Sequence, residues 1–328
     1  MTGEDSLITW LRGRVEGLGW TLIGDDAASL PPAPYQVTVD TQIAGVHFAA
    51  DTEPELVARR LLAVNLSDLA AMGARPAYAF LALSAPRTFA HRAFFRAFIE
   101  ACNRYGVELA GGDLSRQPRL TAALTLLGVP HGRVLRRDHA KAGEDLWIGG
   151  PVGLSTLGCR LVLKGARLRS GRITLPKVLG LPTSLREVAR QAIRRHLEPE
   201  PQLELGRWLA GREGGGAIDL SDGLSRDLHR YCRESGVGAR LDAAAFEGSK
   251  PLELLAARLG TSWRDAALAG GEDYVLLFSL PKGLAPPESF DCRKIGELTD
   301  ESAVQLREED GTLIELPPAG WDHLELEE

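Results

Sequence analysis

The segment AIDLSDGLSRDL, residues 217–228, places three aspartates, Asp219, Asp222 and Asp227, within nine positions of one another. Its apolar beginning predicts a buried strand that delivers carboxylates at its end. Carboxylates held close together raise one another's pKa and destabilise a fold unless cations or hydrogen bonds compensate. The segment therefore indicates that positive charge lies between these acids.

Other acidic residues also stand beside glycines or at the ends of predicted elements. They are Asp25, Asp26, Asp40, Asp68, Asp113, Glu272 and Asp273. Hard divalent cations prefer oxygen ligands, and Mg²⁺ is commonly held by a few carboxylates together with substrate phosphates. Ser221 and the start of a predicted helix at 223–235 add a hydroxyl and a positive helix end, which suits a phosphate group. Together these residues predict a phosphate site with several metal ions.

Each of these residues also has a structural interpretation, which the sequence leaves open. Asp25, Asp26 and Asp113 could be turn residues, and Asp222 could cap a helix. His47 follows a predicted strand and could have a purely structural role. Asp68 differs, because an unpaired acid on an otherwise apolar helix is costly and therefore indicates either a site or a buried ion pair.

Several common phosphate-binding and nucleophilic motifs are absent from the sequence. There is no G-x-x-x-x-G-K-[ST] loop, no protein-kinase signature and no G-x-G-x-x-G after a strand. Lysine occurs at only six positions, and we find no convincing pair of nucleophile and base. Bound metal ions would therefore have to supply the positive charge for phosphate chemistry.

The composition is that of a globular protein, with 44% hydrophobic and 25% charged residues. A net charge of −6 argues against a nucleic-acid-binding surface. The four cysteines form no Cys-x-x-Cys pair, and no apolar stretch approaches the ~20 residues of a membrane span. We therefore expect a cytoplasmic protein without membrane or nucleic-acid partners.

The hydrophobic patterns predict α+β architecture with mixed and antiparallel sheets and flanking helices. A helix at 54–72 is apolar nearly all round and should be buried, and another at 89–105 should end at Gly106. Ser184 and Glu187 suggest a capping box for a helix to about His196, and Asp310-Gly311 suggests a hairpin. Further strands are predicted at 35–40, 119–129, 217–220, 239–242 and 274–280, on both sides of 111–113, and a further helix at 251–259.

The length of 328 residues favours two domains, which we expect at 1–148 and 149–328. The basic stretch 164–182 is predicted to be a loop. Asn65–Asp68 (NLSD) resembles Asp219–Asp222 (DLSD), and Gly111–Asp113 (GGD) resembles Gly270–Asp273 (GGED), in the same order. This repetition suggests related halves that each contribute acids.

Six motifs together resemble the thiamine-monophosphate kinase family, within the aminoimidazole-ribonucleotide synthetase-like superfamily. They are IGDDAA (23–28), VDTQIAGVHF (39–48), LAVNLSDLAAMGARP (62–76), LAGGD (109–113), AIDLSDGLSRDL (217–228) and GGEDY (270–274). The resemblance extends from about residue 5 to GWDHL at 320–324. It implies two α/β domains, the first for ATP, Mg²⁺ and dimerisation and the second completing the site. It also implies direct in-line transfer of phosphate from ATP to thiamine monophosphate, giving thiamine diphosphate.

The resemblance also implies roles for individual residues. The metal carboxylates would be Asp26, Asp40, Asp68, Asp113, Asp219 and Asp222, with Thr38 as a helper and Asp113 and Asp222 the most critical. ATP contacts would be Tyr105, Gly112, Asp113, Arg137 and Ser221. His47, Glu272 and Trp321 would face thiamine monophosphate, whose cationic thiazolium suits an aromatic face. No general base is implied, because the attacking phosphate oxygen is already ionised at neutral pH.

Two departures and two alternatives accompany this hypothesis. Val39 stands where the family often has Thr or Ser, so a metal contact there would come from its backbone carbonyl. LSR follows LAGGD where the family often has TTR-like residues, which leaves the nucleotide contacts of that loop open. The alternatives are another ATP-dependent enzyme of the superfamily and a non-catalytic nucleotide- or metal-binding protein. The family resemblance further suggests a homodimer through the N-terminal halves, with the ATP site near that interface.

Overall fold

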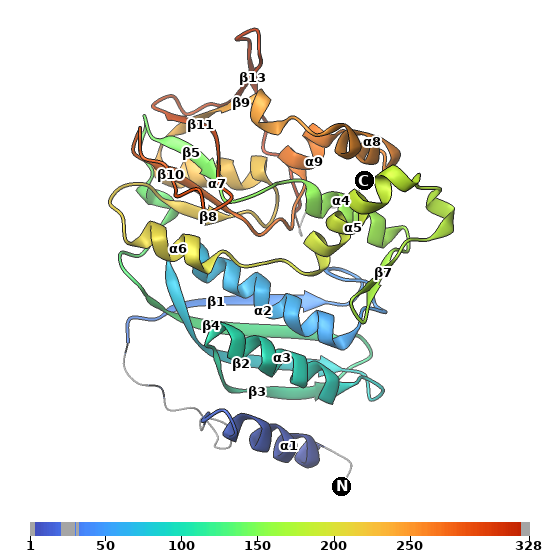
Figure 1. The fold of residues 1–328 in the computed structure, drawn as a ribbon. Helices are drawn as coiled ribbons and strands as arrows, with labels where there is room; N and C mark the ends of the chain where they lie inside the picture. Colours follow the sequence, from blue (N-terminus) through green and yellow to red (C-terminus); the bar gives the residue numbers. More distant parts are fainter. Residues whose placement is uncertain (1–3, 21–29, 31–32, 323–328) are drawn as a thin grey trace.

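The computed structural model describes residues 4–20, 30 and 33–322. Two sheets lie at different levels of the molecule, with helices between and around them (Figure 1). The first sheet is formed by the N-terminal part of the chain and the second by the C-terminal part. The fold is therefore α+β with mixed sheets and flanking helices, as the sequence predicted.

The first sheet has four strands in the order β1-β4-β2-β3. They are β1 (Gln36–Ile43), β2 (Ala74–Ala85), β3 (Glu108–Arg116) and β4 (Thr121–Pro130). β4 is antiparallel to β1 and β2, whereas β2 and β3 are parallel. Helices α2 (Pro54–Ala71) and α3 (His91–Tyr105) pack on one face of this sheet, and α1 (Glu4–Glu16) contacts α3. As predicted, α3 ends at Gly106, which has a positive φ of 69°.

The second sheet has seven strands in the order β13-β12-β9-β11-β5-β10-β8. They are β5 (Asp145–Ile148), β8 (Ala217–Asp219), β9 (Gly238–Asp242), β10 (Leu276–Leu280), β11 (Arg293–Thr299), β12 (Val304–Arg307) and β13 (Leu313–Glu315). β12 and β13 form the predicted hairpin around Gly311. β5 pairs with β10 and β11, so a division after residue 148 would separate this strand from its sheet. We propose that the division between the halves lies between β4 and β5.

The remaining helices surround the second sheet. They are α4 (Leu154–Leu163), α5 (Thr183–Leu197), α6 (Leu203–Ala210), α7 (Leu224–Ser235), α8 (Lys250–Arg258), α9 (Trp263–Ala269) and the short 3₁₀ helices η1 (Arg137–His139), η2 (Lys177–Leu179) and η3 (Ala243–Phe246). α7 ends at Gly236, as predicted. The sequence patterns predicted no element at the places of α1, α6, α9, β2, β5 and β11.

Helix α2 joins the two halves. It contacts β1, β2 and β4 of the first sheet, and also α6, β8 and β10 of the second half. Fourteen of its residues are buried, which explains why its sequence is apolar nearly all round. Side chains of α2 thus reach both halves, and polar residues on it lie at the junction.

Three local predictions were wrong. The Gly-Gly-Asp at 111–113 lies inside the continuous strand β3 and not between two short strands. The stretch 164–182 contains the hairpin β6 (Arg167–Arg169) and β7 (Arg172–Thr174), followed by η2, and not only a loop. Helix α5 begins after Pro182 and has no side-chain cap, because Ser184 lies within the helix, so Ser184 and Glu187 form no capping box.

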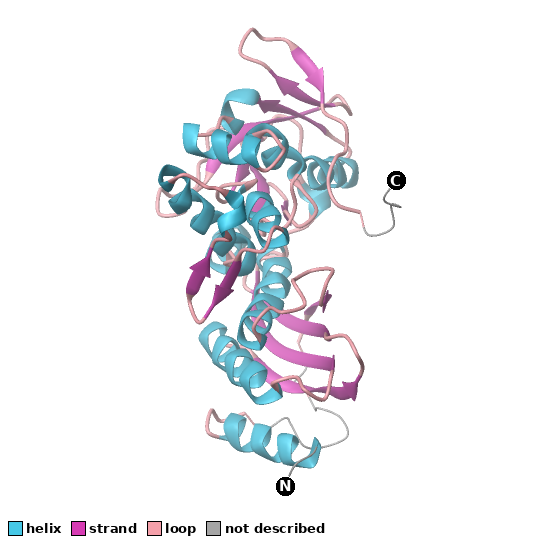
Figure 2. Cartoon of the chain, turned by 90° about the vertical axis from the view of Figure 1, so that its right-hand side faces the viewer, coloured by secondary structure: helices cyan, strands magenta, loops and turns pink. Residues whose placement is uncertain are grey.

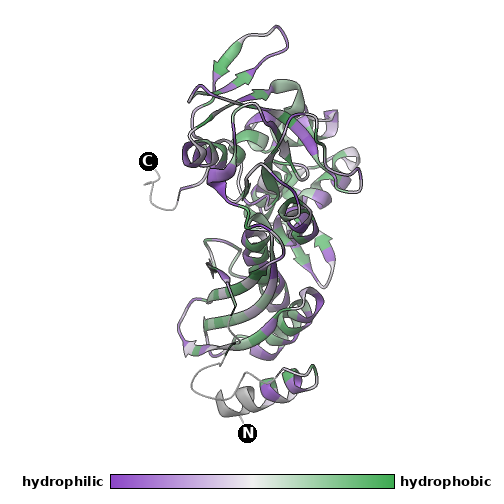
Figure 3. Cartoon of the chain, turned by 90° about the vertical axis from the view of Figure 1, so that its left-hand side faces the viewer, coloured by the Kyte–Doolittle hydropathy of each residue, from purple (hydrophilic) through white to green (hydrophobic). Residues whose placement is uncertain are grey.

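The face of the four-stranded sheet opposite α2 and α3 carries exposed apolar side chains. Val37 and Val39 are 60% and 61% exposed, and they alternate with the half-buried Thr38 and Asp40. The helices lie on one side of this sheet only (Figure 2), and much of the sheet is hydrophobic (Figure 3). Within the described residues, no helix is long and apolar enough to cross a membrane.

A close contact between α2 and α6 gives a test of this junction. A Cβ at Gly206 would overlap the backbone oxygen of Ala70, whereas a Cβ at Gly211 would lie 3.6 Å from its nearest neighbour, the oxygen of Trp208. We expect Gly206→Ala to lower the free energy of unfolding by about 1–3 kcal/mol, because packed backbones must separate. Urea denaturation would measure this, with Gly211→Ala as the control. Equal stability of the two variants would contradict the packing described here.

Candidate active site

Three carboxylates from both halves of the chain meet at the junction. Asp40 lies on β1, Asp68 on α2 and Asp219 at the end of β8. The carboxyl groups of Asp40 and Asp68 share a hydrogen bond, and the hydroxyl of Thr38 donates to Asp68. The hydroxyl of Ser67 donates to Asp219 over 2.8 Å. The fold thus brings together acids that are 179 positions apart in the sequence (219 minus 40).

The electrostatics of this cluster disfavour three negative charges. Burial and the negative charge of the neighbouring Asp40 together raise the pKa of Asp68 to about 7. Burial and Asp68 likewise raise the pKa of Asp219 to about 7, and burial and Asp219 raise the pKa of Asp40 to about 6. Additional positive charge close to the cluster would therefore favour the ionised forms of these carboxylates.

Arg137 supplies part of this charge. It begins η1, and its positive charge lowers the pKa of both Asp68 and Asp219, which places the guanidinium near the cluster. The Arg137 side chain is exposed, unlike Asp219, which is 5% exposed. An exposed arginine beside buried acids can contact an anionic ligand that approaches the cluster.

The loop after β8 is held by Asp227. The Asp227 carboxylate accepts hydrogen bonds from the backbone N–H groups of Ser221 and Asp222, over 3.1 and 3.0 Å. Asp222 does not cap α7: the cap residue is Gly223, with a φ of 121° and no side-chain cap. Instead Arg230 donates from Nη1 to Asp222 over 2.5 Å and to Asp227 over 2.8 Å. The structural interpretation of Asp222 as a helix cap is therefore wrong.

Two further segments dock on this loop through backbone hydrogen bonds. Glu272 N donates to Ser221 O over 2.7 Å, and Tyr274 N donates to Leu220 O over 2.8 Å. Near the C-terminus, Trp321 N donates to Asp222 O over 2.8 Å. The loop 220–223 thus brings Glu272 and Trp321 next to Ser221 and Asp222, although no regular element links them.

His47 lies close enough to Glu272 to lower the pKa of that carboxyl. Its Nδ1 accepts a hydrogen bond of 3.0 Å from the backbone N–H of Ile43, which fixes the imidazole beside the end of β1. His47 and Glu272, which come from different halves, are therefore neighbours. Trp321, the third residue assigned to the acceptor, is 48% exposed.

Other predicted residues lie apart from this cluster. Asp113 is exposed, and its strand partner Ala82 pairs with Ala123, which pairs with Thr41. Since paired residues share a face and neighbours alternate, Asp113 lies on the opposite face of the sheet from Asp40. Within one chain it does not join the cluster, and its assignment to a metal stays a prediction.

The remaining predicted residues have the following places. A Cβ at Gly112 would overlap the backbone oxygen of Leu81, so the packing of β3 against β2 requires glycine at this position. Tyr105 ends α3 and lies under the guanidinium of Arg104, 5.3 Å from its ring centre. Asp25 and Asp26, in IGDDAA, lie outside the described residues. Asp273 accepts hydrogen bonds from Gly153 N and Ser155 N at the start of α4, over 2.8 and 3.3 Å.

Two residues near Glu272 were missed by the sequence analysis. Arg60 donates to the Glu272 carboxylate, and His196 Nδ1 lies 3.1 Å from its other oxygen. Arg60 is as unusual on the apolar helix α2 as Asp68 is, so the same signal could have found it. His196 gave no such signal, because it lies on an amphipathic helix with several arginines.

The donor chemistry of the cluster suits a hard cation. Thr38, Asp40, Asp68 and Asp219 offer only oxygen atoms, and the raised pKa values show that the carboxylates lack positive charge. A different group, Cys159, His196 and Glu272, is the only one among the described residues whose possible ligand atoms all lie within 4.8 Å of one another. The ligand atoms of the oxygen cluster are thus more widely spaced than those of Cys159, His196 and Glu272.

The raised pKa of Asp68 makes a prediction about stability. Because the folded-state pKa, about 7, lies above the usual value near 4, the unfolded chain binds fewer protons between these pH values, and stability falls as pH rises through this window. In EDTA we expect Asp68→Asn to be more stable than the wild type by about 2 kcal/mol at pH 8, and by less at pH 5. Urea denaturation would measure this.

The exposed Asp300 is the control for this experiment. Asp300→Asn should change stability by similar small amounts at both pH values. If the advantage of Asp68→Asn does not grow between pH 5 and pH 8, the described repulsion among the carboxylates is wrong.

Comparisons with known proteins identify the family of this chain. Residues 24–130 match the family described as AIR synthase related protein, N-terminal domain. Thiamine-monophosphate kinase of Escherichia coli K12 is 34% identical over 342 residues, which cover 98% of each chain. The crystal structure of thiamine-monophosphate kinase from Stenotrophomonas maltophilia has a TM-score of 0.75 and 35% identity, and covers 93% of this chain and 96% of that one. A structure described as AaThiL complexed with AMPPCP and TMP has a TM-score of 0.76 and 26% identity, and covers 99% of both chains. The chain therefore belongs to the thiamine-monophosphate kinase family.

Proposed function

We propose that this protein phosphorylates thiamine monophosphate with ATP, giving thiamine diphosphate and ADP. Family membership supports the activity, since relatives along nearly the whole chain bear this name and one related structure is described with AMPPCP and TMP. The observation in this chain that carries the proposal is the meeting of Asp40, Asp68 and Asp219 at the junction, beside Arg137. Such a site suits the charge of two reacting phosphate groups.

The proposed reaction is one in-line step. A phosphate oxygen of thiamine monophosphate forms a bond to the γ-phosphorus of ATP. The bond between that phosphorus and the bridging oxygen to the β-phosphorus breaks, and ADP leaves with the electron pair. The acceptor oxygen is ionised at neutral pH, so the protein has to position the two substrates and offset their charge, without a general base.

Asp40, Asp68 and Asp219, with the hydroxyl of Thr38, would hold Mg²⁺. When bound, Mg²⁺ neutralises phosphate charge and orients the phosphates. Asp26, Asp113 and Asp222 remain predicted ligands, and a contribution from the backbone carbonyl of Val39 remains open. Arg137 would contact the phosphates of ATP from the exposed side of the cluster, while Ser221, Gly112 and Tyr105 remain predicted ATP contacts.

The acceptor would bind where His47, Glu272 and Trp321 approach the loop 220–223. The half-exposed indole of Trp321 offers an aromatic face to the cationic thiazolium. The loop carries Ser221 and Asp222, which follow Asp219 by two and three positions. This proximity would place the acceptor phosphate next to the carboxylate cluster.

We also propose that two copies associate through the outer face of the four-stranded sheet. This face carries Val37 and Val39, and the register continues it through Leu127, Thr125 and Phe80 on the neighbouring strands. Exposed apolar side chains on a sheet face that no helix covers are typical of an interface. Asp113 lies on the same face, so association would enclose it.

A coupled assay of ADP release tests the proposed function. We expect ADP release in the presence of thiamine monophosphate and Mg²⁺, and none with free thiamine, which lacks the acceptor phosphate. Asp40→Asn should lower kcat at least about 100-fold, because charge stabilisation in the transition state is lost. Its thermal unfolding temperature should not fall, because Asp40 is repelled by its neighbours.

Asp300→Asn is the control for this assay and should keep wild-type activity. ADP release that does not depend on thiamine monophosphate would contradict the proposed acceptor. The absence of any ADP release from the wild type would favour a non-catalytic binding protein.

The proposed association has its own test. Val39→Asp places a charge on the outer face, at a position of the edge strand β1, where burial against a second copy would be unfavourable. We expect the wild type to be a dimer and Val39→Asp to be a monomer by light scattering after size-exclusion chromatography. Val178→Asp, at a position 88% exposed in the second half, should remain a dimer. A monomeric wild type would contradict the proposal.

A further inference from the structure

Arg60 is a buried cation at the junction of the two halves. It lies on α2, and its side chain is 2% exposed. Nη2 donates to Oε1 of Glu272, and Nη1 donates to the backbone oxygen of His196. A single side chain of the first half thus holds two residues of the second half.

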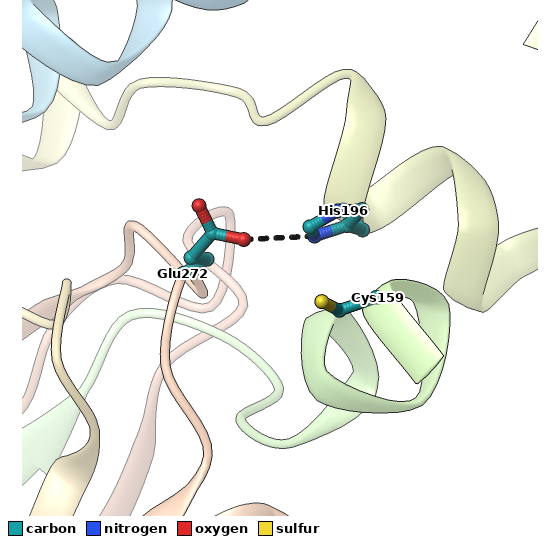
Figure 4. A group of neighbouring side chains, drawn as sticks. All are labelled: Cys159, His196 and Glu272. Carbon is teal, nitrogen blue, oxygen red and sulfur yellow. Dashed lines mark ion pairs between the residues drawn. The ribbon is translucent and has the colours of Figure 1, made fainter. Parts of the chain in front are cut away.

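The second oxygen of Glu272 is also held. His196 Nδ1 lies 3.1 Å from Glu272 Oε2, and the two side chains point toward each other (Figure 4). The backbone of Glu272 has a φ of 64°, which is uncommon for a residue with a side chain, and its N–H is bound to Ser221 O. Both the carboxylate and the backbone of Glu272 are therefore fixed.

Arg60 is costly for the fold. Its Nε is buried and has no hydrogen-bond partner among the described residues, although the centre of the Tyr274 ring lies 5.8 Å from its guanidinium carbon. A buried arginine contributes little net stability, because its loss of hydration opposes its ion pair. A role in fixing a functional group explains its presence better than stability does.

A metal site at the same place is less well supported. Cys159, His196 and Glu272 lie close together (Figure 4), and such residues can bind Zn²⁺. However, Arg60 already offsets the charge of Glu272, and burial raises the pKa of the Cys159 thiol to about 11. Metal ligation needs the thiolate, which is disfavoured here at neutral pH. The presence of Arg60 therefore favours a hydrogen-bonded network of Arg60, His196 and Glu272 over a metal site.

We propose that Arg60 is a positioning residue that fixes Glu272 for binding of the phosphorylated acceptor. This inference rests on the proposed function, in which Glu272 faces thiamine monophosphate. Arg60 holds one oxygen of the Glu272 carboxylate and His196 holds the other. The remaining lone pairs of these oxygens therefore point in fixed directions and can accept a hydrogen bond from the ligand. Arg60 acts through Glu272 and touches neither substrate.

The position of Arg60 on α2 gives it a second consequence. Asp68 lies eight residues further along the same helix, which corresponds to about 12 Å along the axis. The helix is rigid and buried, so Arg60 and Asp68 set the separation between the acceptor-binding carboxylate and the carboxylate cluster. Arg60 thereby couples the position of the acceptor to the position of the metal-binding acids.

The test compares Arg60→Met with Arg59→Met. Arg59 is the neighbouring residue on the same helix; its side chain is half exposed, and its Nη2 lies 3.9 Å from Oε1 of Glu198. Calorimetric titration with thiamine monophosphate and, separately, with a non-hydrolysable ATP analogue and Mg²⁺ gives the affinities, and the ADP assay gives kcat and KM. We expect Arg60→Met to weaken acceptor binding and raise its KM at least about tenfold, whereas affinity for the ATP analogue changes less than about twofold. Arg59→Met should behave like the wild type.

A double-mutant cycle with Glu272→Gln tests whether Arg60 acts through Glu272. We expect the double variant to bind the acceptor no more weakly than the weaker single variant, because the two changes disrupt one interaction. Arg60→Lys should be intermediate, because it keeps the positive charge but replaces the two separate donor nitrogens, Nη1 and Nη2, with a single ammonium nitrogen. This conservative variant also serves if Arg60→Met does not fold.

The outcomes separate this inference from the proposed function. A wild type without activity toward thiamine monophosphate would contradict the proposed function itself. An active wild type with unchanged acceptor affinity in Arg60→Lys or Arg60→Met, or with additive effects in the cycle, would overturn the role of Arg60. Equal losses for acceptor and ATP analogue would indicate general loss of structure and would overturn it too.

Discussion

Repulsion among buried carboxylates is the constraint around which this molecule is arranged. Burial, together with their closeness to one another, raises the pKa values of Asp40, Asp68 and Asp219 to between about 6 and 7, and within the part of the chain that the structure describes no cation fully offsets their charge. Arg137 opposes the repulsion only in part, from the exposed side. Holding three acids in this way lowers the stability of the fold. The arrangement is understandable if the site binds cations and phosphates.

The contrast with Glu272 shows how differently the fold can treat an acid. Burial alone would raise the pKa of this carboxyl, but Arg60 and His196 outweigh burial and lower the pKa to about 2. Glu272 thus stays ionised and fixed in direction, while the cluster acids gain protons easily. The junction therefore contains two kinds of carboxylate. Glu272 is paired with Arg60, which suits it to orienting a ligand. Asp40, Asp68 and Asp219 lack sufficient positive charge, which suits them to binding metal ions.

Helix α2 and the loop 220–223 connect these groups. α2 carries Arg60 and Asp68, and it packs on the first sheet and on α6, β8 and β10 at the same time. The loop receives backbone hydrogen bonds from Glu272, Tyr274 and Trp321, so two distant segments of the chain converge on it. The Asp227 carboxylate holds the loop by accepting hydrogen bonds from the backbone N–H groups of Ser221 and Asp222. A change in either element would move residues of both halves.

The sequence by itself determined the elements with strong periodicity or glycine ends, such as α2, α3 and α7. It singled out Asp68 because an acid on an apolar helix is costly, and it listed Asp40 and Asp219 among several acids at the ends of predicted elements or beside glycines. It missed α6 and β11, which are short or polar, and also the long apolar strand β2, and it placed the Gly-Gly-Asp between strands although it lies within β3. Only the tertiary structure decided which acids meet. Asp113 lies on the opposite face of its sheet from Asp40, since side chains alternate along a strand and the face depends on register. The pairing of Arg60 with Glu272, 212 positions away, likewise follows from the packing of α2 against the second half, because local sequence patterns contain no information about such distant contacts.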